Sequence, residues 1–341
     1  MDTVLIFRIG SLGDTIVALP CFHRIAQAFP DSRRLVVSDL PASRKAAPVE
    51  SVLGESGLID GVIYFPPPPR RLRDLLALRA QIRATGAKKL VYVADRGLGA
   101  TLRDLVFFYG CGIRRVIGAP LSRGLRKLRV DPATGDTERE AERLVRCLAP
   151  LGPIDLDDPA AWDLRLQPAE IRAADMALAA LRGQPFIALS TGGRQRGKDW
   201  GERNWSALLQ MLGARRPDLA FVFVGSADEL ERAAMLSARC NLPSLNLCGR
   251  LAPRESAAAI SRAMLFVGHD SGPLHLAAAV GVPCVGLFGP FNMPKWWHPM
   301  GAQHHIIHNM RDVAEIATQD VFAVIDAKLP ANAERRERTS A

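Results

Sequence analysis

The chain has 341 residues, which is more than one typical hydrophobic core and predicts two domains of about 150 residues each. Apolar residues make up 48% of it and charged residues 23%, a balance typical of a soluble globular protein. No uncharged run of transmembrane length occurs, and Met1-Asp2-Thr3 leads directly into an apolar segment. We therefore predict neither a membrane-spanning helix nor a signal peptide, and we expect a cytoplasmic protein.

The formal net charge of +9 predicts anionic partners, such as nucleic acid, an anionic membrane face or an acidic small substrate. Nucleic acid is the least favoured, because the basic residues are dispersed and no nucleic-acid-binding motif occurs. The six cysteines have no C-x-x-C spacing, which disfavours both a zinc site and a disulfide framework. We predict no metal and no other cofactor, and we expect a monomer.

The chain begins with an apolar segment, Val4 to Ile9, which predicts a buried strand followed by a glycine turn at 10–14. Residues 15–29 have helical spacing, and Pro30 ends the predicted helix. The turn lacks the full G-x-G-x-x-G pattern and so does not favour a dinucleotide cofactor. Asp14 has two interpretations: it caps the helix together with Ser11, or it lies at the mouth of the sheet as a general base.

Further apolar segments predict strands at 35–37, 61–65, 89–93 and 115–118, separated by helical patterns. This alternation is typical of an α/β domain with a mostly parallel sheet. Two basic clusters lie in the same part of the chain, and each either forms a solvated surface or contacts an anionic acceptor through arginine forks. Their residues are Arg70, Arg71 and Arg73, which follow the polyproline turn 66–69, and Arg123, Arg126 and Lys127.

The proline-rich stretch 150–185 predicts the connection between the domains, and the second domain is expected to begin with a strand at 186–189. The following loop, 190–200, combines glycines and hydroxyls with three cations and is typical of a phosphate cradle. Thr191, Gly192 and Lys198 are its candidate binding residues. A helix at 205–213 and a strand at 221–224 come next. Glu229, just past that strand, either holds ribose hydroxyls or is an acid in the first turn of a helix.

The most informative stretch is a predicted strand at 264–267, a turn, a helix at 274–280 and a second strand at 284–288. Ser271 and Gly272 lie at the start of the helix, where backbone N–H groups and the helix dipole favour an anion such as a diphosphate. Asp270 is either a helix cap or a functional carboxylate. His275 is either a hydrogen-bonded core histidine or part of the site.

Taken together, four ordered blocks resemble glycosyltransferase family 9, the lipopolysaccharide heptosyltransferase type. They are Arg8 to Asp14 with Leu19-Pro20, Lys198-Asp199-Trp200 with Trp205, Gly268 to His275, and Phe288-Gly289-Pro290. The resemblance covers nearly the whole chain and implies a GT-B fold, in which two Rossmann-like domains face across a cleft. The expected parts are an acceptor domain at 1–160, a linker at 161–184, a donor domain at 185–310, a C-terminal helix at 311–330 that crosses back to the first domain, and a polar, disordered tail at 331–341.

The resemblance further implies an inverting, metal-independent transfer of heptose from ADP-heptose to the inner core of lipopolysaccharide, at the cytoplasmic face of the inner membrane. In that scheme Asp14 is the general base and Lys198 offsets charge on the donor, while Ser271 and Gly272 cradle the diphosphate. The implied donor-binding residues are Thr191, Gly192, Lys198, Glu229, Leu251, Asp270, Ser271, Gly272 and His275. The expected acceptor-binding residues are Gly13 and, from the two basic clusters, Arg70, Arg71, Arg73, Arg123 and Arg126.

The sequence departs from the expected pattern in the loop 192–197, which is rich in glycine and arginine instead of threonine. Three alternatives therefore stay open. The chain could use another nucleotide sugar or an acceptor other than lipopolysaccharide, it could be a GT-B nucleotide-sugar epimerase, or it could be a nucleotide-binding or anionic-surface-binding module without catalytic activity.

Overall fold

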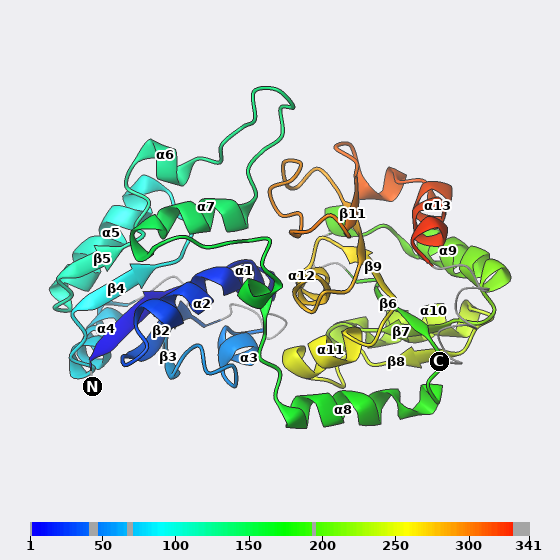
Figure 1. Ribbon diagram of the computed structural model, residues 1–341, viewed down its shortest axis with the longest axis horizontal. Helices are drawn as coiled ribbons and strands as arrows, with labels where there is room; N and C mark the ends of the chain where they lie inside the picture. Colours follow the sequence, from blue (N-terminus) through cyan, green and yellow to red (C-terminus); the bar gives the residue numbers. More distant parts are fainter. Residues whose placement is uncertain (1, 41–46, 67–70, 193–195, 330–341) are drawn as a thin grey trace. The chain divides into compact units, whose positions relative to one another are not determined.

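The contacts of the chain divide it into two units, each built around one parallel sheet (Figure 1). The computed structural model describes residues 2–40, 47–66, 71–192 and 196–329. The first unit comprises Met1–Gln167 with the short segment Met293–His298, and the second comprises Pro168–Asn292 with Pro299–Ala341. The predicted linker 161–184 is thus divided between the units, and the predicted tail 331–341 lies outside the described residues. None of the described helices is both long enough and apolar enough to cross a bilayer.

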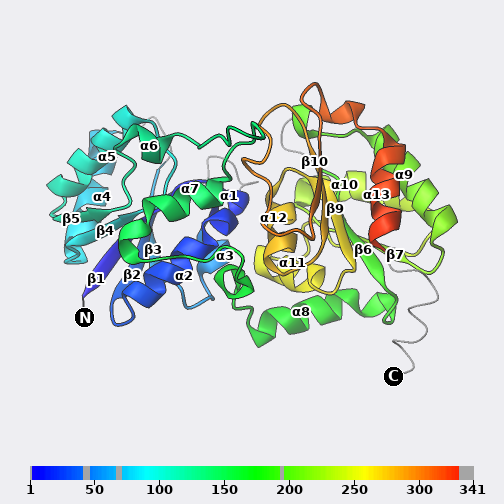
Figure 2. The same ribbon diagram turned by 45° about the horizontal axis from the view of Figure 1, so that its top comes forward.

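The sheet of the first unit has the strand order β3-β2-β1-β4-β5, with β1 at its centre (Figure 2). All its pairings are parallel, as the α/β alternation predicted. Its strands are β1 (Thr3–Phe7), β2 (Arg33–Asp39), β3 (Gly61–Phe65), β4 (Lys89–Tyr92) and β5 (Arg115–Ile117). Its helices are α1 (Leu12–Val17), α2 (Leu19–Ala28), α3 (Glu50–Leu53), α4 (Leu72–Ala84), α5 (Leu98–Gly110), α6 (Arg123–Arg126) and α7 (Glu140–Cys147), with 3₁₀ turns η1 (Ala149–Leu151) and η2 (Pro159–Trp162).

The single helix predicted at 15–29 is in fact two helices, α1 and α2, which meet at Ala18. Pro20 causes the break, because proline has no N–H with which to continue the helical ladder and its ring clashes with the preceding turn. The first helix also begins earlier than predicted, at Leu12, since Ser11 and Asp14 cap it. This short helix keeps Asp14 close to the end of β1.

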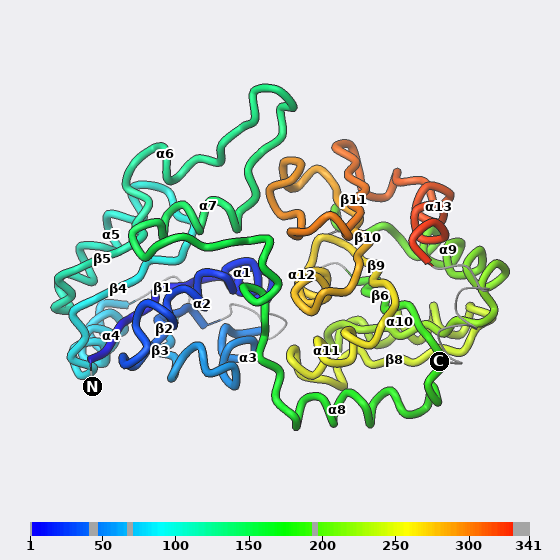
Figure 3. The backbone as a smooth tube through the Cα atoms, viewed as in Figure 1, coloured from blue at the N-terminus to red at the C-terminus, as the bar shows by residue number. Residues whose placement is uncertain are grey.

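The sheet of the second unit is parallel throughout and has the order β11-β10-β9-β6-β7-β8. Its strands are β6 (Phe186–Ser190), β7 (Ala220–Phe223), β8 (Ser244–Asn246), β9 (Leu265–His269), β10 (Cys284–Phe288) and β11 (His305–His308). Its helices are α8 (Pro168–Leu178), α9 (Glu202–Arg215), α10 (Leu230–Arg239), α11 (Pro253–Ile260), α12 (Gly272–Ala279) and α13 (Thr318–Lys328), with 3₁₀ turns η3 (Ala179–Leu181), η4 (Arg196–Lys198), η5 (Ala227–Glu229) and η6 (Val313–Glu315). Figure 3 follows the chain from β10 to β11 through the segment Met293–His298.

The last helix, α13, packs against α9 inside the second unit. Val321, Ile325 and Leu329 are buried in the same apolar cluster as Trp200 and Trp205. This packing differs from the prediction that the helix crosses back to the first domain. Its apolar stripe has the spacing of a packed helix, but spacing alone does not indicate which surface covers it.

Each sheet has a point where the order of its strands reverses. In the first unit β1 has β2 on one side and β4 on the other, and in the second unit β6 lies between β7 and β9. The loops that follow neighbouring strands at such a switch point diverge to opposite faces of the sheet, which leaves room for a ligand at the carboxyl ends of the strands. The switch points therefore lie between β1 and β4 and between β6 and β9.

Candidate active site

At the switch point of the first sheet, Asp14 follows β1 and caps α1. Its Oδ2 accepts hydrogen bonds from the backbone N–H of Ser11 (2.8 Å) and from the Ser11 hydroxyl (3.0 Å). The capping interpretation is therefore confirmed. Within the described part of the chain Oδ1 accepts no hydrogen bond, so capping leaves one carboxylate oxygen available to take a proton.

The loop before Asp14 fits closely around it. Gly10 has a φ of +123°, and a Cβ at this position would lie 2.6 Å from the Cβ of Asp14, so only glycine is tolerated. The guanidinium of Arg8 is buried; it donates to the carbonyl of Val93 (3.0 Å), which follows β4, and to the carbonyl of Asp14. Arg8 thus fastens the two loops of the switch point to each other. Gly13 lies buried in the first turn of α1.

A second carboxylate, Asp95, follows β4 at the same switch point. Its side chain is 47% exposed, and its Oδ1 lies 3.7 Å from Nη2 of Arg143. Partial burial raises the pKa of Asp95, although the positive charge of Arg143 opposes this shift. Arg143 itself is buried and donates to both carboxylate oxygens of the equally buried Glu140. Sequence reasoning did not select Asp95, although a carboxylate just past an apolar strand was the available signal.

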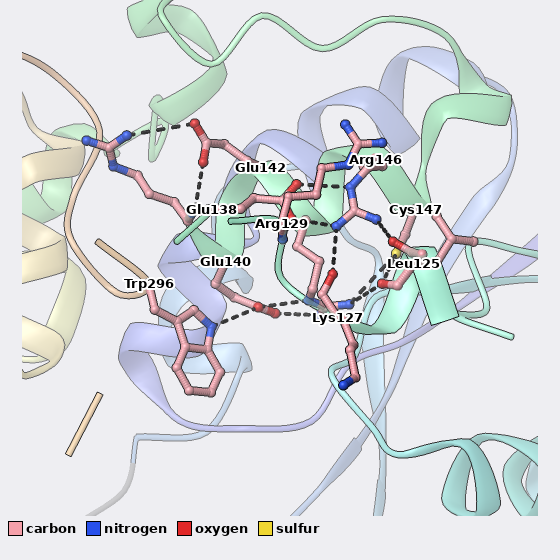
Figure 4. Close-up of polar contacts among 12 residues, drawn as sticks. Leu125, Lys127, Arg129, Glu138, Glu140, Glu142, Arg146, Cys147 and Trp296 are labelled. Atoms are coloured by element: carbon pink, nitrogen blue, oxygen red, sulfur yellow. Dashed lines mark hydrogen bonds and ion pairs between the residues drawn. The ribbon is translucent and has the colours of Figure 1, made fainter. Parts of the chain in front are cut away.

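The segment Met293–His298 docks on the N-terminus of α7 through the same Glu140. The carbonyl of Trp296 accepts from the Glu140 N–H (2.8 Å), and the Trp296 indole donates to Oε2 of Glu140 (3.2 Å), as Figure 4 shows. Lys295 pairs with Asp136. Next to this contact, Glu138 and Arg146 form a second ion pair (Figure 4). Trp296 therefore helps to fix Glu140, Glu140 binds Arg143, and Arg143 lies beside Asp95.

The described arginines of the two basic clusters do not contact Asp14 through hydrogen bonds or ion pairs. Arg71 and Arg73 are exposed at the start of α4, and Arg73 lies 3.7 Å from Asp74. Arg123 is exposed in α6, and Arg126 donates to the carbonyls of Pro120 and Leu121. Among the described residues none of these four arginines makes a hydrogen bond or ion pair with Asp14, and Arg70 lies outside the described residues. Their acceptor-binding role stays a prediction.

At the switch point of the second sheet, Lys198 meets Asp270. The ammonium lies 2.6 Å from Oδ2 of Asp270, which also accepts from the side-chain amide of Asn292 (2.6 Å). The ring of Phe291 lies 5.9 Å from the ammonium and adds a cation–π contact. Three loops, those after β6, β9 and β10, thus combine to fix one cation at the carboxyl edge. Asn292 and Phe291 were missed because they follow the Phe288-Gly289-Pro290 block, where no pattern indicates which side chain turns inward.

His269 holds the loop that carries Lys198. The histidine is fully buried; its Nδ1 contacts the carbonyl of Gly192 (3.2 Å), and its Nε2 accepts from the N–H of Trp200 (3.0 Å). Burial lowers the pKa of His269 to about 4, so the ring is neutral, with its proton on Nδ1. This side chain therefore joins the start and the end of the loop 192–200. The middle of that loop, 193–195, lies outside the described residues.

Glu229 lies at the neighbouring strand end, after β7. Its Oε2 is buried and has no hydrogen-bond partner among the described residues, and burial raises the pKa of the carboxyl. The carboxylate fits between two glycines: a Cβ on Gly192 would lie 2.3 Å from its carboxyl carbon, and one on Gly225 would lie 1.7 Å from Oε2. A buried carboxylate oxygen without a partner is costly, so it suits a donor that a ligand supplies.

The remaining predicted donor residues lie at the same edge or next to it. Thr191 is buried just after β6, and Leu251 is half-buried in the connection that follows β8. Ser271 is the N-cap of α12, and its hydroxyl donates to the carbonyl of His269 (3.2 Å). Gly272 begins α12, and His275 is buried within that helix. Among the described residues no cluster of three or more His, Cys, Asp or Glu side chains is arranged to hold a metal ion.

Comparison with solved structures supports the fold. The chain is 20% identical to a family 9 glycosyl transferase from Veillonella parvula, with a TM-score of 0.76 and coverage of 96% of this chain and 98% of that one. It is 17% identical to the Escherichia coli heptosyltransferase WaaC, solved with ADP-2-deoxy-2-fluoro heptose, with a TM-score of 0.65 and coverage of 96% and 100%. The fold is therefore GT-B, as predicted.

Comparison of sequences supports the family. The chain is 30% identical to lipopolysaccharide heptosyltransferase 3 of Escherichia coli over 165 residues, which are 44% of this chain and 48% of the relative. This match thus spans about half the length of that relative. The model of glycosyltransferase family 9 (heptosyltransferase) matches residues 125–323, more than half of the chain. Because that match includes α12 and the strands on both sides of it, the resemblance seen in the sequence is confirmed, and the chain belongs to glycosyltransferase family 9.

Proposed function

We propose that the protein is an inverting, metal-independent glycosyltransferase that moves a heptose from ADP-heptose to an inner-core lipopolysaccharide acceptor. One observation carries the proposal. Each sheet has chemically complementary groups at its switch point: a carboxylate with an unoccupied oxygen in the first unit, and a fixed cation beside a helix N-terminus in the second. These are the base and the leaving-group seat that such a displacement needs.

The donor diphosphate is proposed to bind at the N-terminus of α12, near Lys198. Gly272 and Leu274 lie in the first turn of α12, where backbone N–H groups have no intrahelical partner and favour negative charge, whereas Pro273 between them has no N–H to offer. The short contact with Asp270 holds Lys198 in one position, so the cation needs little reorganisation when charge develops on the departing diphosphate. Asp270 and Asn292 are then positioned to orient the sugar or phosphate oxygens. Lys198 is exposed enough, at 23% of its side chain, to reach a ligand.

The ribose of the donor is proposed to bind Glu229. Oε2 of Glu229 would accept hydrogen bonds from ribose hydroxyls, which would satisfy an oxygen that the described residues leave without a partner. Leu251, Thr191 and His275 complete the proposed donor set. Their roles rest on the resemblance to the family.

In the reaction itself, Asp14 is proposed to act as general base. Its Oδ1 removes the proton from the acceptor hydroxyl, whose oxygen attacks the anomeric carbon of the sugar. The bond between that carbon and the diphosphate oxygen breaks on the opposite face, so the configuration inverts. The electron pair leaves with ADP, and its charge is stabilised by Lys198 and the α12 N–H groups. Asp14 ends protonated and returns its proton to solvent.

The choice of ADP-heptose is supported by the names of similar proteins: a heptosyltransferase solved with an ADP-heptose analogue and a curated lipopolysaccharide heptosyltransferase. The +9 charge supports an anionic acceptor. The monomeric state and the cytoplasmic location stay predictions.

A thermal-shift screen with ADP-, UDP- and GDP-sugars tests the donor. A true donor at a hundred times its dissociation constant should raise the unfolding free energy by about 2.7 kcal/mol. Products are then identified after incubation with ADP-heptose and a lipopolysaccharide acceptor fragment. A new glycoside with inverted anomeric configuration is expected. Epimerised free donor instead would favour the epimerase, and stabilisation by a UDP- or GDP-sugar alone would contradict the ADP-heptose assignment.

A further inference from the structure

Two helices of the first unit expose large apolar side chains in regular rows. On α4 these are Leu72 and Leu76, which are 71% and 54% exposed. On α5 the row repeats at every third or fourth residue, with Leu98 (41%), Leu102 (47%), Val106 (73%) and Tyr109 (52%). The core uses the opposite sides of these helices, through Leu78 and Ile82 of α4 and Leu105 and Phe108 of α5. The exposed rows are therefore extra apolar surface that the fold does not need.

The two rows belong to one surface. Both helices cover the same face of the sheet, because the connections β3 to β4 and β4 to β5 run in the same direction along the strand order. They also contact each other, and Arg79 of α4 donates to the carbonyl of Gly110 at the end of α5 (3.0 Å). We call the outward side of α4 and α5 the α4–α5 face.

Arginines lie among the apolar residues of this face. Arg79 and Arg83 continue the row of Leu72 and Leu76 along α4, and Arg103 is 67% exposed on α5. With Arg71 and Arg73, the two helices and the N-cap of α4 carry five arginines and only two aspartates.

Both aspartates already have partners. Asp74 accepts from the N–H of Arg71 (2.9 Å) and lies 3.7 Å from Arg73. Asp104 accepts from the Tyr92 hydroxyl (2.9 Å) and lies 3.3 Å from Arg96 and 4.0 Å from Arg103. Five arginines against two aspartates leave the α4–α5 face with a net positive charge, to which Arg79 and Arg83 contribute without an aspartate beside them on the same helix turn.

We propose that the α4–α5 face docks on the surface of an anionic bilayer. Rows of leucine, valine and tyrosine suit the boundary between headgroups and acyl chains, where amphipathic helices lie, and the arginines suit lipid phosphates. The other described unit has no such rows: its large exposed apolar residues, Met176, Leu230, Phe291 and Met310, are far apart in the sequence. A bilayer thus matches both the apolar and the cationic character of one face.

The α4–α5 face lies next to the edge of the sheet that carries Asp14, so docking would bring a membrane-anchored acceptor toward the proposed base. Helices α4 and α5 begin at the carboxyl edge of the sheet, because each follows a parallel strand, and Asp14 lies at that same edge. An acceptor anchored in the bilayer would be presented at the end of the face that carries Leu72 and Leu98. This use of the docking rests on the proposed function, in which the acceptor is a glycolipid and is therefore anchored in a membrane.

Sedimentation of the full-length protein with vesicles tests the docking. We expect binding to phosphatidylcholine vesicles that contain phosphatidylglycerol, and much weaker binding to phosphatidylcholine alone. Arg83→Gln with Arg103→Gln should weaken binding about fivefold for each arginine. Leu76→Ser with Val106→Ser should weaken it about tenfold. Met176→Ser is the matched control, because Met176 is 74% exposed in the second unit, and it should bind like the unchanged protein.

The result that overturns the docking is vesicle binding that is absent, or that the two double variants leave unchanged. Gel filtration provides a further outcome: if the unchanged protein is an oligomer that Leu76→Ser with Val106→Ser disperses, the face is a self-association surface and the proposal fails. Transfer to a water-soluble acceptor fragment separates this inference from the proposed function. Retained transfer with failed docking overturns only the docking, whereas intact docking without transfer overturns only the proposed activity.

Discussion

Asp14→Asn separates the two roles of one carboxylate, because the variant can keep the cap but cannot act as a base. The amide oxygen of Asn can accept the same two hydrogen bonds from Ser11 that Oδ2 accepts at 2.8 and 3.0 Å. The loss of a negative charge in the first turn of α1 should cost about 0.3–1 kcal/mol of stability. The amide cannot take a proton at neutral pH, so turnover should fall about 10²- to 10⁴-fold, which is about 3–5 kcal/mol in the barrier.

The assay combines a thermal melt, an ADP titration and a steady-state rate on one preparation of the variant. ADP affinity should be nearly unchanged, because the proposed donor residues belong to the other unit. Glu255→Gln is a matched control: Glu255 accepts from the N–H of Ala252 (2.8 Å) in the corresponding cap of α11. Glu255→Gln should lose about as much stability as Asp14→Asn, and its turnover should be unchanged.

Near-normal turnover in a folded Asp14→Asn protein would refute the reasoning and leave Asp14 as a cap. Asp95, which follows β4 at the same switch point, is then the next candidate for the base. If Asp95→Asn lost turnover while Asp14→Asn kept it, Asp95 would be the base.

The remaining predictions concern Lys198, Glu229 and the need for a metal. Lys198→Ala should lower kcat at least tenfold in a protein that still folds, and its melting temperature should fall, because the side chain of Asp270 is only 9% exposed and loses its partner cation; unaltered kinetics would return Lys198 to a structural role. Glu229→Gln should weaken ADP binding about tenfold, measured by calorimetry, because hydrogen bonds to the charged oxygen are lost. Burial raises the pKa of Glu229 above its ordinary value of 4.5, so the unchanged protein loses stability as pH rises above that value. The Gln variant should therefore melt higher at neutral pH and show no advantage below about pH 4.5; the same melting temperature at every pH would contradict this. Transfer should also persist in EDTA, and a loss that magnesium or manganese restores would show that the reaction needs a metal.

Most of the fold could be predicted because buried parallel strands have strong apolar patterns. The strands predicted at 61–65 and 284–288 coincide with β3 and β10, and those at 89–93 and 186–189 differ from β4 and β6 by one residue. The two edge strands β8 and β11 were missed, since an edge strand is short and need not be apolar on both faces. The partner of α13 was also mistaken, because a helical stripe does not identify what covers it.

The candidate site was predicted in part. Motif residues at strand ends, such as Glu229 and Asp270, could be placed because the carboxyl ends of parallel strands share an edge. The partners that fix them could not be placed: His269 joins Gly192 to Trp200, and Asn292 holds Asp270, through contacts between segments far apart in the sequence. Such contacts depend on how loops fold back, which no periodic pattern encodes. Nor could a sequence show that Asp14 both caps a helix and leaves one oxygen without a partner.

The assignment of Met293–His298 to the first unit limits how this protein can be divided into fragments. A fragment that ended at Gln167 would contain the strands and helices of that unit but would lack Trp296, whose indole and carbonyl both bind Glu140. A buried carboxylate would lose one of its donors, and the Arg143 that it holds would be open to water on that side. Chimeras that exchange the first unit between relatives would meet the same problem. The first unit is discontinuous in sequence, so the six residues Met293–His298 must be transferred together with Met1–Gln167.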